Sequence, residues 1–240
     1  ATIKKKQVYN GNGVKITATD LVNNNLFFDF ENTSSKDLTT SIRAYAINGV
    51  MANCSWDTME TSLPAKSKTE NSLQIPDKMW QDDIEVIKSI KVQFWFFEDG
   101  SEIETTSPIT IKTSAYDKKN DKIKYEKVKK SNGTVYGLVE KNNQHAIFLI
   151  KNKNKSWYSY SLDSLVLDDR AFDGDCDRLG CLDEVVFSNC VLPIKIALDT
   201  DTLGMFCLKH DIDEPKMTLG IDEYPKGDYY NYSSSKVVLK

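Results

Sequence analysis

Four acidic residues between positions 173 and 184 have the clearest spacing for chemistry in this 240-residue sequence. They are Asp173, Asp175, Asp177 and Glu184. Positions 1, 3, 5 and 12 of a calcium-binding loop carry the carboxylates that ligate the ion, and these residues have that spacing. Arg178 stands where such a loop has its turn glycine, and Gly180 stands where an aliphatic residue is usual. The segment therefore predicts either a calcium site or an acidic hairpin tip.

Aromatic residues form a second candidate site near the end of the chain. The tyrosines stand among Gly, Asp, Asn and Ser residues: Tyr224, Tyr229, Tyr230 and Tyr232. Exposed rings of this kind stack on sugars or anchor a protein partner. Trp157, Tyr158 and Tyr160 form a further group, in which strand alternation places the two tyrosines on one face and Trp157 on the other. Packing in the core is the alternative for both groups.

The sequence contains no pairing of a nucleophile and a base that would indicate an enzyme. The only histidines are His145 and His210, and neither lies in a nucleophile elbow, a zinc-protease motif or a phosphate-binding loop. Cys207 precedes His210 by three positions, but the spacing to the other cysteines is not that of a zinc finger. We therefore predict a non-enzymatic protein with no catalytic residues and no cofactor other than the calcium of the acidic loop.

The five cysteines are an odd number, so at least one thiol has no intramolecular partner. We predict mostly buried free thiols that behave as small apolar residues. A disulfide between Cys176 and Cys181 is the alternative.

Composition limits the classes of partner. The 31 Lys and Arg against 35 Asp and Glu give a net charge of −4, which argues against nucleic acid as the main partner. No run approaches the roughly 18 to 20 apolar residues of a membrane helix, so we predict no transmembrane segment. The first residue is Ala rather than Met, which suggests a removed upstream segment such as a targeting sequence.

Short alternations of apolar and polar residues, rich in β-branched and aromatic types, run through the chain. Residues 14–18, 26–30 and 92–97 are strand candidates, and Asn48-Gly49 is the strongest hairpin signal. The segment from Pro76 to Ser89 predicts one short helix, because its apolar residues roughly keep helical spacing behind a proline.

A shift of about 120 residues aligns the two halves of the chain. Asn12-Gly13 then falls on Asn132-Gly133, and Asn32 falls on Asn152. Chance agreement between two β-rich halves is the alternative explanation. The alignment predicts an all-β protein with two tandem Ig-like β-sandwich domains related by a divergent internal repeat.

The predicted domains are 1–115 and 132–240, joined by a Lys-rich linker at 116–131. The lysines of the linker favour a solvated connection that discourages strand-to-strand aggregation. A basic patch for an acidic polymer at a cell surface is the alternative.

Four short motifs follow one another in the first half of the chain. They are GVKIT at 13–17, ENTS at 31–34, the Asn-Gly turn at 48–49 and PAKS at 64–67. In this order they resemble the repeats of exported Clostridia-type (Gram-positive) lipoproteins of uncharacterised function. The resemblance covers 1–114 well and 132–240 weakly, since the second half has no counterpart of the PAKS segment. It implies an envelope-anchored protein with a lipid anchor upstream of residue 1, and it supplies no catalytic residues.

These observations predict a non-enzymatic protein of the bacterial envelope, anchored or secreted outside the cytoplasmic membrane. It would present or space binding surfaces toward an unknown protein or glycan at the cell surface. The alternative is a calcium-dependent adhesive or carbohydrate-binding module that uses the acidic loop and the C-terminal tyrosines.

Overall fold

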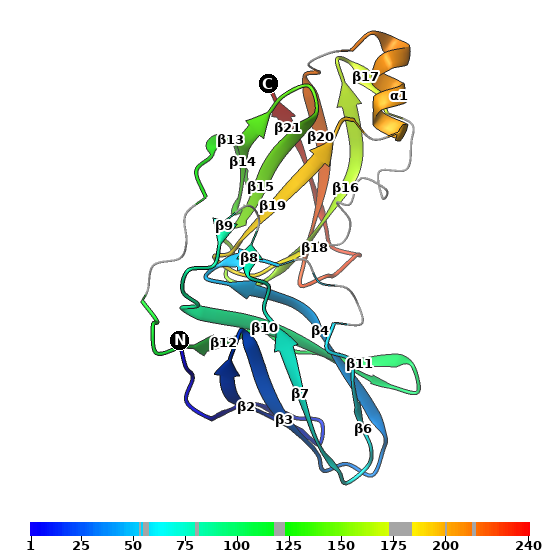
Figure 1. Cartoon of the computed structure of the whole chain (residues 1–240). Coiled ribbons are helices and arrows are strands. Elements are labelled where there is room, and N and C mark those ends of the chain that lie inside the picture. Colours follow the sequence, from blue (N-terminus) through cyan, green and yellow to red (C-terminus); the bar gives the residue numbers. More distant parts are fainter. Residues whose placement is uncertain are drawn as a thin grey trace. The chain divides into compact units, whose positions relative to one another are not determined.

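The computed structural model describes residues 1–52, 54, 58–79, 82–117, 123–172, 184–199, 201–212 and 215–240. In this part of the chain the fold is nearly all β, with sandwich-like sheets and one short helix (Figure 1). The chain divides into two compact units, unit 1 at Ala1–Asp121 and unit 2 at Lys122–Lys240. No helix among these residues combines the length and the apolar character that a membrane crossing requires.

The first sheet of unit 1 is an antiparallel ladder in the order β1-β2-β3-β7. Its strands are β1 (Lys6–Gly11), β2 (Val14–Val22), β3 (Asn25–Asn32) and β7 (Lys68–Gln74). Buried and more exposed residues alternate along β2 and β3, as in a sheet with one face on the core. This face carries Ile16, Phe28 and Phe30, all fully buried.

The second sheet of unit 1 is built around two long strands, β4 (Leu38–Ile47) and β10 (Ser89–Glu98). These pair with each other, β10 also pairs with β11 and β12, and β4 also pairs with β5 and β6. The shorter strands are β5 (Val50–Met51), β6 (Thr61–Leu63), β11 (Ser101–Thr105) and β12 (Ile109–Lys112). The predicted strand at 92–97 is therefore confirmed.

The predicted helix from Pro76 to Ser89 is wrong. The segment instead holds the short paired strands β8 (Lys78–Met79) and β9 (Asp82–Asp83), and β10 begins at Ser89. The amide of Ile84 donates to the carbonyl of Asp77 at 2.9 Å, which closes this small hairpin. Ile87 is buried in the core cluster. Tertiary pairing and burial thus override a weak helical spacing.

An apolar cluster joins the two sheets of unit 1. The ring of Phe94 lies edge-on to Phe28 and Phe30, with centroids 5.5 and 6.2 Å apart. Phe96 stacks on Tyr9 at 5.3 Å. Aromatic contacts from strands far apart in sequence therefore hold the two sheets of unit 1 together.

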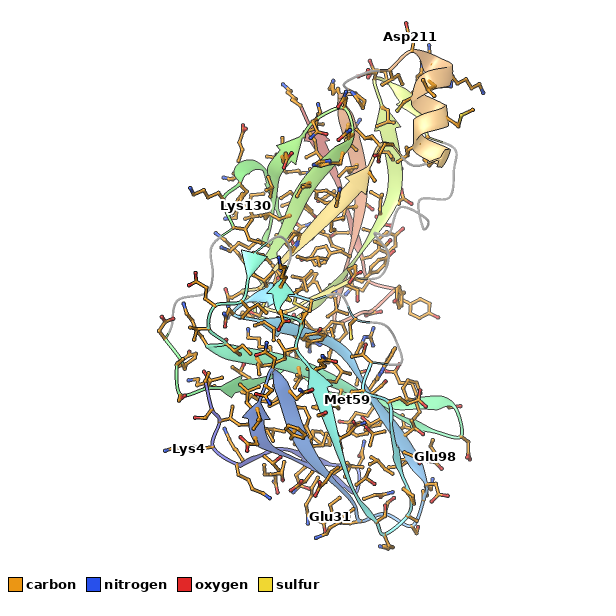
Figure 2. The ribbon with its side chains drawn as sticks, viewed as in Figure 1. Lys4, Glu31, Met59, Glu98, Lys130 and Asp211 are labelled. Carbon is orange, nitrogen blue, oxygen red and sulfur yellow. The ribbon has the colours of Figure 1, made fainter. Side chains whose placement is uncertain are left out.

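The first sheet of unit 2 has the order β13-β14-β15-β19. Its strands are β13 (Glu126–Ser131), β14 (Thr134–Lys141), β15 (His145–Asn152) and β19 (Val191–Ala197). The predicted linker 116–131 is wrong in its second part, because β13 occupies it. Figure 2 labels Lys130, an exposed residue of this strand. Lysines suit an edge strand, where charge opposes aggregation, so Lys content does not exclude a strand here.

The second sheet of unit 2 is built around β16 (Tyr158–Leu167). It pairs with β17 (Arg170–Ala171), β18 (Glu184–Val186) and β20 (Met217–Pro225), and β20 pairs with β21 (Ser233–Leu239). The helix α1 (Asp201–His210) stands between β19 and β20 in the chain. Figure 2 labels Asp211 at its end, where a φ of 55° terminates the helix.

The strand positions of the two units agree. The strands β13, β15, β16 and β17 each begin 120 residues after β1, β3, β4 and β5. Register shifts follow the same offset: one lies between Gln7 and Tyr9 in β1 and one between Lys127 and Lys129 in β13. Bulges are specific features of a strand pair, so their coincidence is a stronger match than strand length alone.

Tight turns also correspond. Asn48-Gly49 has φ values of 51° and 87°, and Asp168-Asp169 has 47° and 66°. Positive φ at both central residues is the two-residue turn that suits hairpin twist, which Asn, Asp and Gly tolerate. The predicted hairpin at Asn48-Gly49 is confirmed, since it connects β4 and β5.

A buried asparagine is the last residue of the third strand in each unit. The amide nitrogen of Asn32 donates to the carbonyls of Lys36, Leu63 and Pro64 at 2.8, 2.8 and 3.1 Å. The amide nitrogen of Asn152 donates to the carbonyls of Ser156 and Val186, both at 2.9 Å. Each side chain thus supplies a donor to one buried carbonyl, that of Leu63 or that of Val186, and to loop carbonyls nearer the surface.

Candidate functional site

The acidic loop lies mostly outside the described residues. Asp173, Asp175 and Asp177 fall there, while Glu184 opens β18 opposite Tyr160. Within the described part of the chain, no group of three or more His, Cys, Asp and Glu side chains is arranged to hold a metal ion. The calcium site therefore stays a prediction.

None of the described cysteines is in a disulfide. Cys190 and Cys207 are buried and Cys54 is half-buried, while Cys176 and Cys181 lie outside the described residues. Burial raises the pKa of the Cys207 thiol, and the charge of Asp168 raises it further. A buried thiol with a raised pKa is a poor nucleophile, so Cys207 has a packing role.

Among the described residues, the two histidines contact a carboxylate and an aromatic ring. The Nε2 of His145 lies 3.3 Å from Oε1 of the exposed Glu140. The ring of His210, at the end of α1, packs against Phe206 with centroids 4.7 Å apart. Neither contact places a nucleophile beside the imidazole.

The structure brings three of the four predicted tyrosines together. The Tyr224 ring, at the end of β20, lies 4.9 Å from the Tyr229 ring and 5.5 Å from the Tyr232 ring. Tyr229 is 51% exposed, Tyr232 is 56% exposed and Tyr230 is fully exposed. We call Tyr224, Tyr229, Tyr230 and Tyr232 the tyrosine patch.

Successive turns after β20 fold the chain back and gather these rings. The amides of Gly227 and Asp228 donate to the carbonyls of Tyr224 and Pro225 at 3.2 and 3.0 Å. The amide of Lys226 donates to the carbonyl of Trp157 at 3.0 Å, which ties the turn to the start of β16. The side chain of Asp228 accepts from the amide of Tyr230 at 3.1 Å. Gly, Asp and Lys in this segment therefore position the aromatic residues.

Polar groups border the patch. Asp222 accepts from the Tyr224 hydroxyl at 3.3 Å and from the Ser234 hydroxyl. Ser159 stands directly opposite Tyr224 in the ladder, so both side chains lie on the same face of the sheet. Ser159 is fully buried, and its hydroxyl has no hydrogen-bond partner among the described residues.

The second aromatic group consists of Trp157, Tyr158 and Tyr160, and its two tyrosines share one face, as strand alternation predicts. The rings of Tyr158 and Tyr160 stack with centroids 6.2 Å apart. Tyr160 and Trp157 are buried. Core packing, the alternative for this group, is therefore what the structure has at Tyr160 and Trp157.

A buried carboxylate is the feature that sequence reasoning missed. Glu223, next to Tyr224 and on the opposite face of β20, is 0% exposed. Its carboxylate accepts from the Tyr136 hydroxyl at 2.6 Å, the Ser235 hydroxyl at 2.9 Å and the Thr134 hydroxyl at 3.2 Å. Thr134 also bonds the Tyr160 hydroxyl at 2.9 Å. We call these five residues the Glu223 cluster.

Burial dominates the electrostatics of the cluster. It raises the pKa of Glu223, against the opposing effects of the three hydroxyl donors and of Lys129. Burial and the nearby carboxylate also raise the pKa of Tyr136. Because Glu223 has no solvent access, this group joins β14, β16, β20 and β21 rather than meeting a substrate.

A signal for Glu223 was present in the sequence. Asp222 and Glu223 are consecutive residues of a strand pattern, so they must point to opposite faces of the sheet. One of the two must therefore face the core.

No protein-family model and no curated protein matches the chain. Among solved structures, the YadV chaperone is 10% identical, covers 95% of this chain and 100% of its own, and gives a TM-score of 0.28. The CupB2 chaperone of Pseudomonas aeruginosa is 10% identical, with 90% and 93% covered and a TM-score of 0.24. The SafA pilin complex with the SafB chaperone of Salmonella enterica is 11% identical, with 98% and 100% covered and a TM-score of 0.24. TM-scores this low carry no argument, so the site alone supports a function.

Proposed function

We propose that the protein is a non-enzymatic binding module of the bacterial envelope that binds a carbohydrate on the tyrosine patch of unit 2. One observation carries the proposal. Three tyrosine rings with centroids 4.9 and 5.5 Å apart gather at the end of one strand, with Tyr229 and Tyr232 more than half exposed. Tyrosine is among the residues that most often anchor a bound partner when several rings lie together at a surface.

The chemistry of the patch suits a sugar. Tyrosine rings offer flat faces that stack on the C–H face of a pyranose, and their hydroxyls form hydrogen bonds at the rim. Asp222 and Ser234 add a carboxylate and a hydroxyl beside the rings. Apolar stacking with a few polar groups is the usual composition of a small-ligand site.

A binding role fits the chain better than catalysis. The carboxyl with a raised pKa, Glu223, is buried and hydrogen-bonded by three hydroxyls. The patch itself holds no nucleophile paired with a base among the described residues. These arguments support a non-enzymatic module.

We further propose that the two units are tandem Ig-like domains from a divergent duplication. The offset of 120 residues in strand starts and the buried Asn32 and Asn152 support this. In this account unit 1 acts as a spacer that presents the binding surface of unit 2. The motifs of the first half, which resemble those of exported lipoproteins, support a location outside the cytoplasmic membrane with an anchor upstream of residue 1.

A glycan array with purified protein tests the proposal. The variant combines Tyr229→Ala, Tyr230→Ala and Tyr232→Ala, and we expect it to lose about tenfold or more of the affinity, since stacked aromatic anchors dominate such sites. The matched control combines Phe27→Ala and Tyr116→Ala, which remove rings of unit 1 that are 40% and 37% exposed.

The proposal fails if the wild type binds no glycan, or if the tyrosine variant binds as well as the control. Repeating the array in EDTA addresses the calcium-dependent adhesive. Binding that EDTA abolishes would favour a role for the acidic loop, and binding that it leaves unchanged would favour the tyrosine patch alone.

A further inference from the structure

Unit 1 has a groove of about 490 Å³ beside two edge strands, β1 of the first sheet and β12 of the second sheet. The N-terminal segment crosses this edge. The amide of Ser114 donates to the carbonyl of Thr2 at 2.7 Å, and the amide of Thr2 donates to the Ser114 hydroxyl at 3.1 Å. These two hydrogen bonds hold the N-terminal segment beside β12, so this segment forms one wall of the groove.

The floor of the groove is apolar. It is formed by Ile3, Val8, Ala18 and Ile111. Ala18 and Ile111 belong to the core cluster of unit 1, and Ile3 and Val8 pack against that cluster. The groove is therefore a continuation of the apolar core toward the surface. A volume of this size lies within the range of small-ligand sites, roughly 300 to 1,000 Å³.

The rim of the groove is cationic. Lys4, Lys5, Lys6 and Lys112 line it, and all four are exposed. Figure 2 labels Lys4, whose side chain extends outward from the N-terminal segment. Among the described residues no carboxylate lines the groove. Lys5 pairs with Asp29 at 2.9 Å, and the ammonium of Lys112 lies 4.3 Å from the centre of the Tyr116 ring. Lys4, Lys6 and Lys112 therefore have no carboxylate partner among the described residues.

A second groove of unit 1 shows that this imbalance is local. That groove, about 420 Å³, has Lys5, Lys15 and Lys68 together with Asp29, Glu31 and Glu70. Its lysines pair with its own acids, at 3.5 Å for Lys15 and 3.7 Å for Lys68 with Glu31. Of these two grooves, the one at the N-terminal segment combines an apolar floor with unbalanced positive charge.

We propose that this groove binds a fatty acid, a single-chain anionic amphiphile. The acyl chain lies on the floor formed by Ile3, Val8 and Ile111, and the carboxylate meets the ammonium groups of Lys4, Lys6 and Lys112. Lysine stems cover apolar surface while their charged ends stay in water, so the rim contacts both parts of the ligand. This site lies in unit 1 and does not depend on the tyrosine patch.

Calorimetric titration of the full chain with octanoate, decanoate and dodecanoate, each below its micelle concentration, tests chain-length dependence. Affinity should rise by about two- to fourfold for each added methylene, since each one buries more apolar surface. Dodecanol, which has the same chain and no charge, should bind about tenfold or more weakly.

Two variants test the residues. Combining Lys4→Glu, Lys6→Glu and Lys112→Glu should weaken dodecanoate binding by about tenfold or more. The control makes the same charge change on exposed lysines of unit 2, with Lys130→Glu, Lys153→Glu and Lys155→Glu, and should stay within about twofold. Ile3→Asp, in a segment outside the strands, should also weaken binding by about tenfold.

Affinity that does not depend on chain length would overturn the proposal, as would an equal loss in the control. So would binding to phosphatidylglycerol vesicles without binding to monomeric dodecanoate, because that result assigns the lysines to a bilayer surface.

Discussion

At one equivalent position of their sheets, unit 1 has a buried aromatic residue and unit 2 has a buried acidic residue. Phe96 of β10 pairs with Thr40, two residues beyond the pair of Phe94 and Ile42. Glu223 of β20 pairs with Tyr160, two residues beyond the pair of Ile221 and Leu162. Both Phe96 and Glu223 are buried. A sandwich of this type thus accepts either side chain at that position.

The neighbours of each residue explain the difference. Phe96 stacks on Tyr9, within an apolar cluster. Glu223 faces hydroxyls that satisfy its carboxylate, from Tyr136, Thr134 and Ser235. A buried charge without such donors would be strongly unfavourable. The polar residues of unit 2 therefore form a set in which the hydroxyls satisfy the buried carboxylate.

The next residue along each strand, on the outer face, differs as well. In unit 1 this residue is Phe97, which packs edge-on against Trp95 at 5.2 Å, and Arg43 lies 5.4 Å from the Trp95 ring. In unit 2 it is Tyr224, which gathers the exposed rings of Tyr229 and Tyr232. In unit 1 an arginine packs on the outer aromatic residues, whereas in unit 2 the outer aromatic group includes rings that are more than half exposed.

The largest effect is expected from the apolar core of unit 1. Phe94→Ala should lower the free energy of unfolding of unit 1 by about 3–5 kcal/mol, because it removes a ring packed on Phe28 and Phe30. Hydrogen exchange of peptides from unit 1, followed by mass spectrometry, measures this. A loss below about 1 kcal/mol would mean that the site collapses and that the core is not as described.

Glu223→Ala should destabilise unit 2 by about 2–4 kcal/mol, since it leaves buried hydroxyls of Tyr136, Ser235 and Thr134 without an acceptor. Urea unfolding, followed in peptides of unit 2, gives the value. Glu223→Gln is the matched control, because it keeps the shape and one carbonyl acceptor and should lose less. Equal stability of the alanine variant and the wild type would refute the cluster.

The two asparagines offer a matched pair. Asn32→Ala in unit 1 and Asn152→Ala in unit 2 should each cost about 2–3 kcal/mol, because both leave buried carbonyls without a donor. Unfolding of the two variants under identical conditions is the comparison. A large effect in one unit and none in the other would break the correspondence between the units.

Glu223 also predicts a pH dependence confined to unit 2. Its pKa in the folded state is raised above the ordinary value of 4.5, so the folded state binds more protons than the unfolded state above that pH. The contribution of Glu223 to the stability of unit 2 is complete below pH 4.5, and it is lost as the pH rises through the raised pKa. The slope from this group is at most about 1.4 kcal/mol per pH unit.

Urea unfolding between pH 4 and 8 measures this slope. The stability of wild-type unit 2 should fall with rising pH in the window above the ordinary pKa, and Glu223→Gln should remove that component. Identical pH profiles for the two proteins would show that Glu223 does not titrate in that range.

Local pattern was enough to predict part of the fold. Positive φ at Asn48-Gly49 follows from residue type, and the strand at 92–97 follows from its apolar and aromatic composition. The segments that failed depend on distant partners. Pairing between β8 and β9 overrides the helical spacing after Pro76, and the edge position of β13 makes its lysines compatible with a strand.

The candidate site divides in the same way. The tyrosines cluster in sequence, so composition revealed them before their geometry was known. The Glu223 cluster combines residues from 134 to 235, and only strand pairing brings its hydroxyls to one carboxylate. The groove at the N-terminal segment likewise needs Ser114 to hold Thr2. Contacts between distant residues are not visible in local periodicity.

The most direct test of the binding function is a solution NMR titration of ¹⁵N-labelled protein with the oligosaccharide that binds best on the array. The account predicts shift changes at residues 222–234 and at Ser159, with little change in unit 1. Shift changes confined to unit 1, or the same changes in the variant with Tyr229→Ala, Tyr230→Ala and Tyr232→Ala, would contradict it.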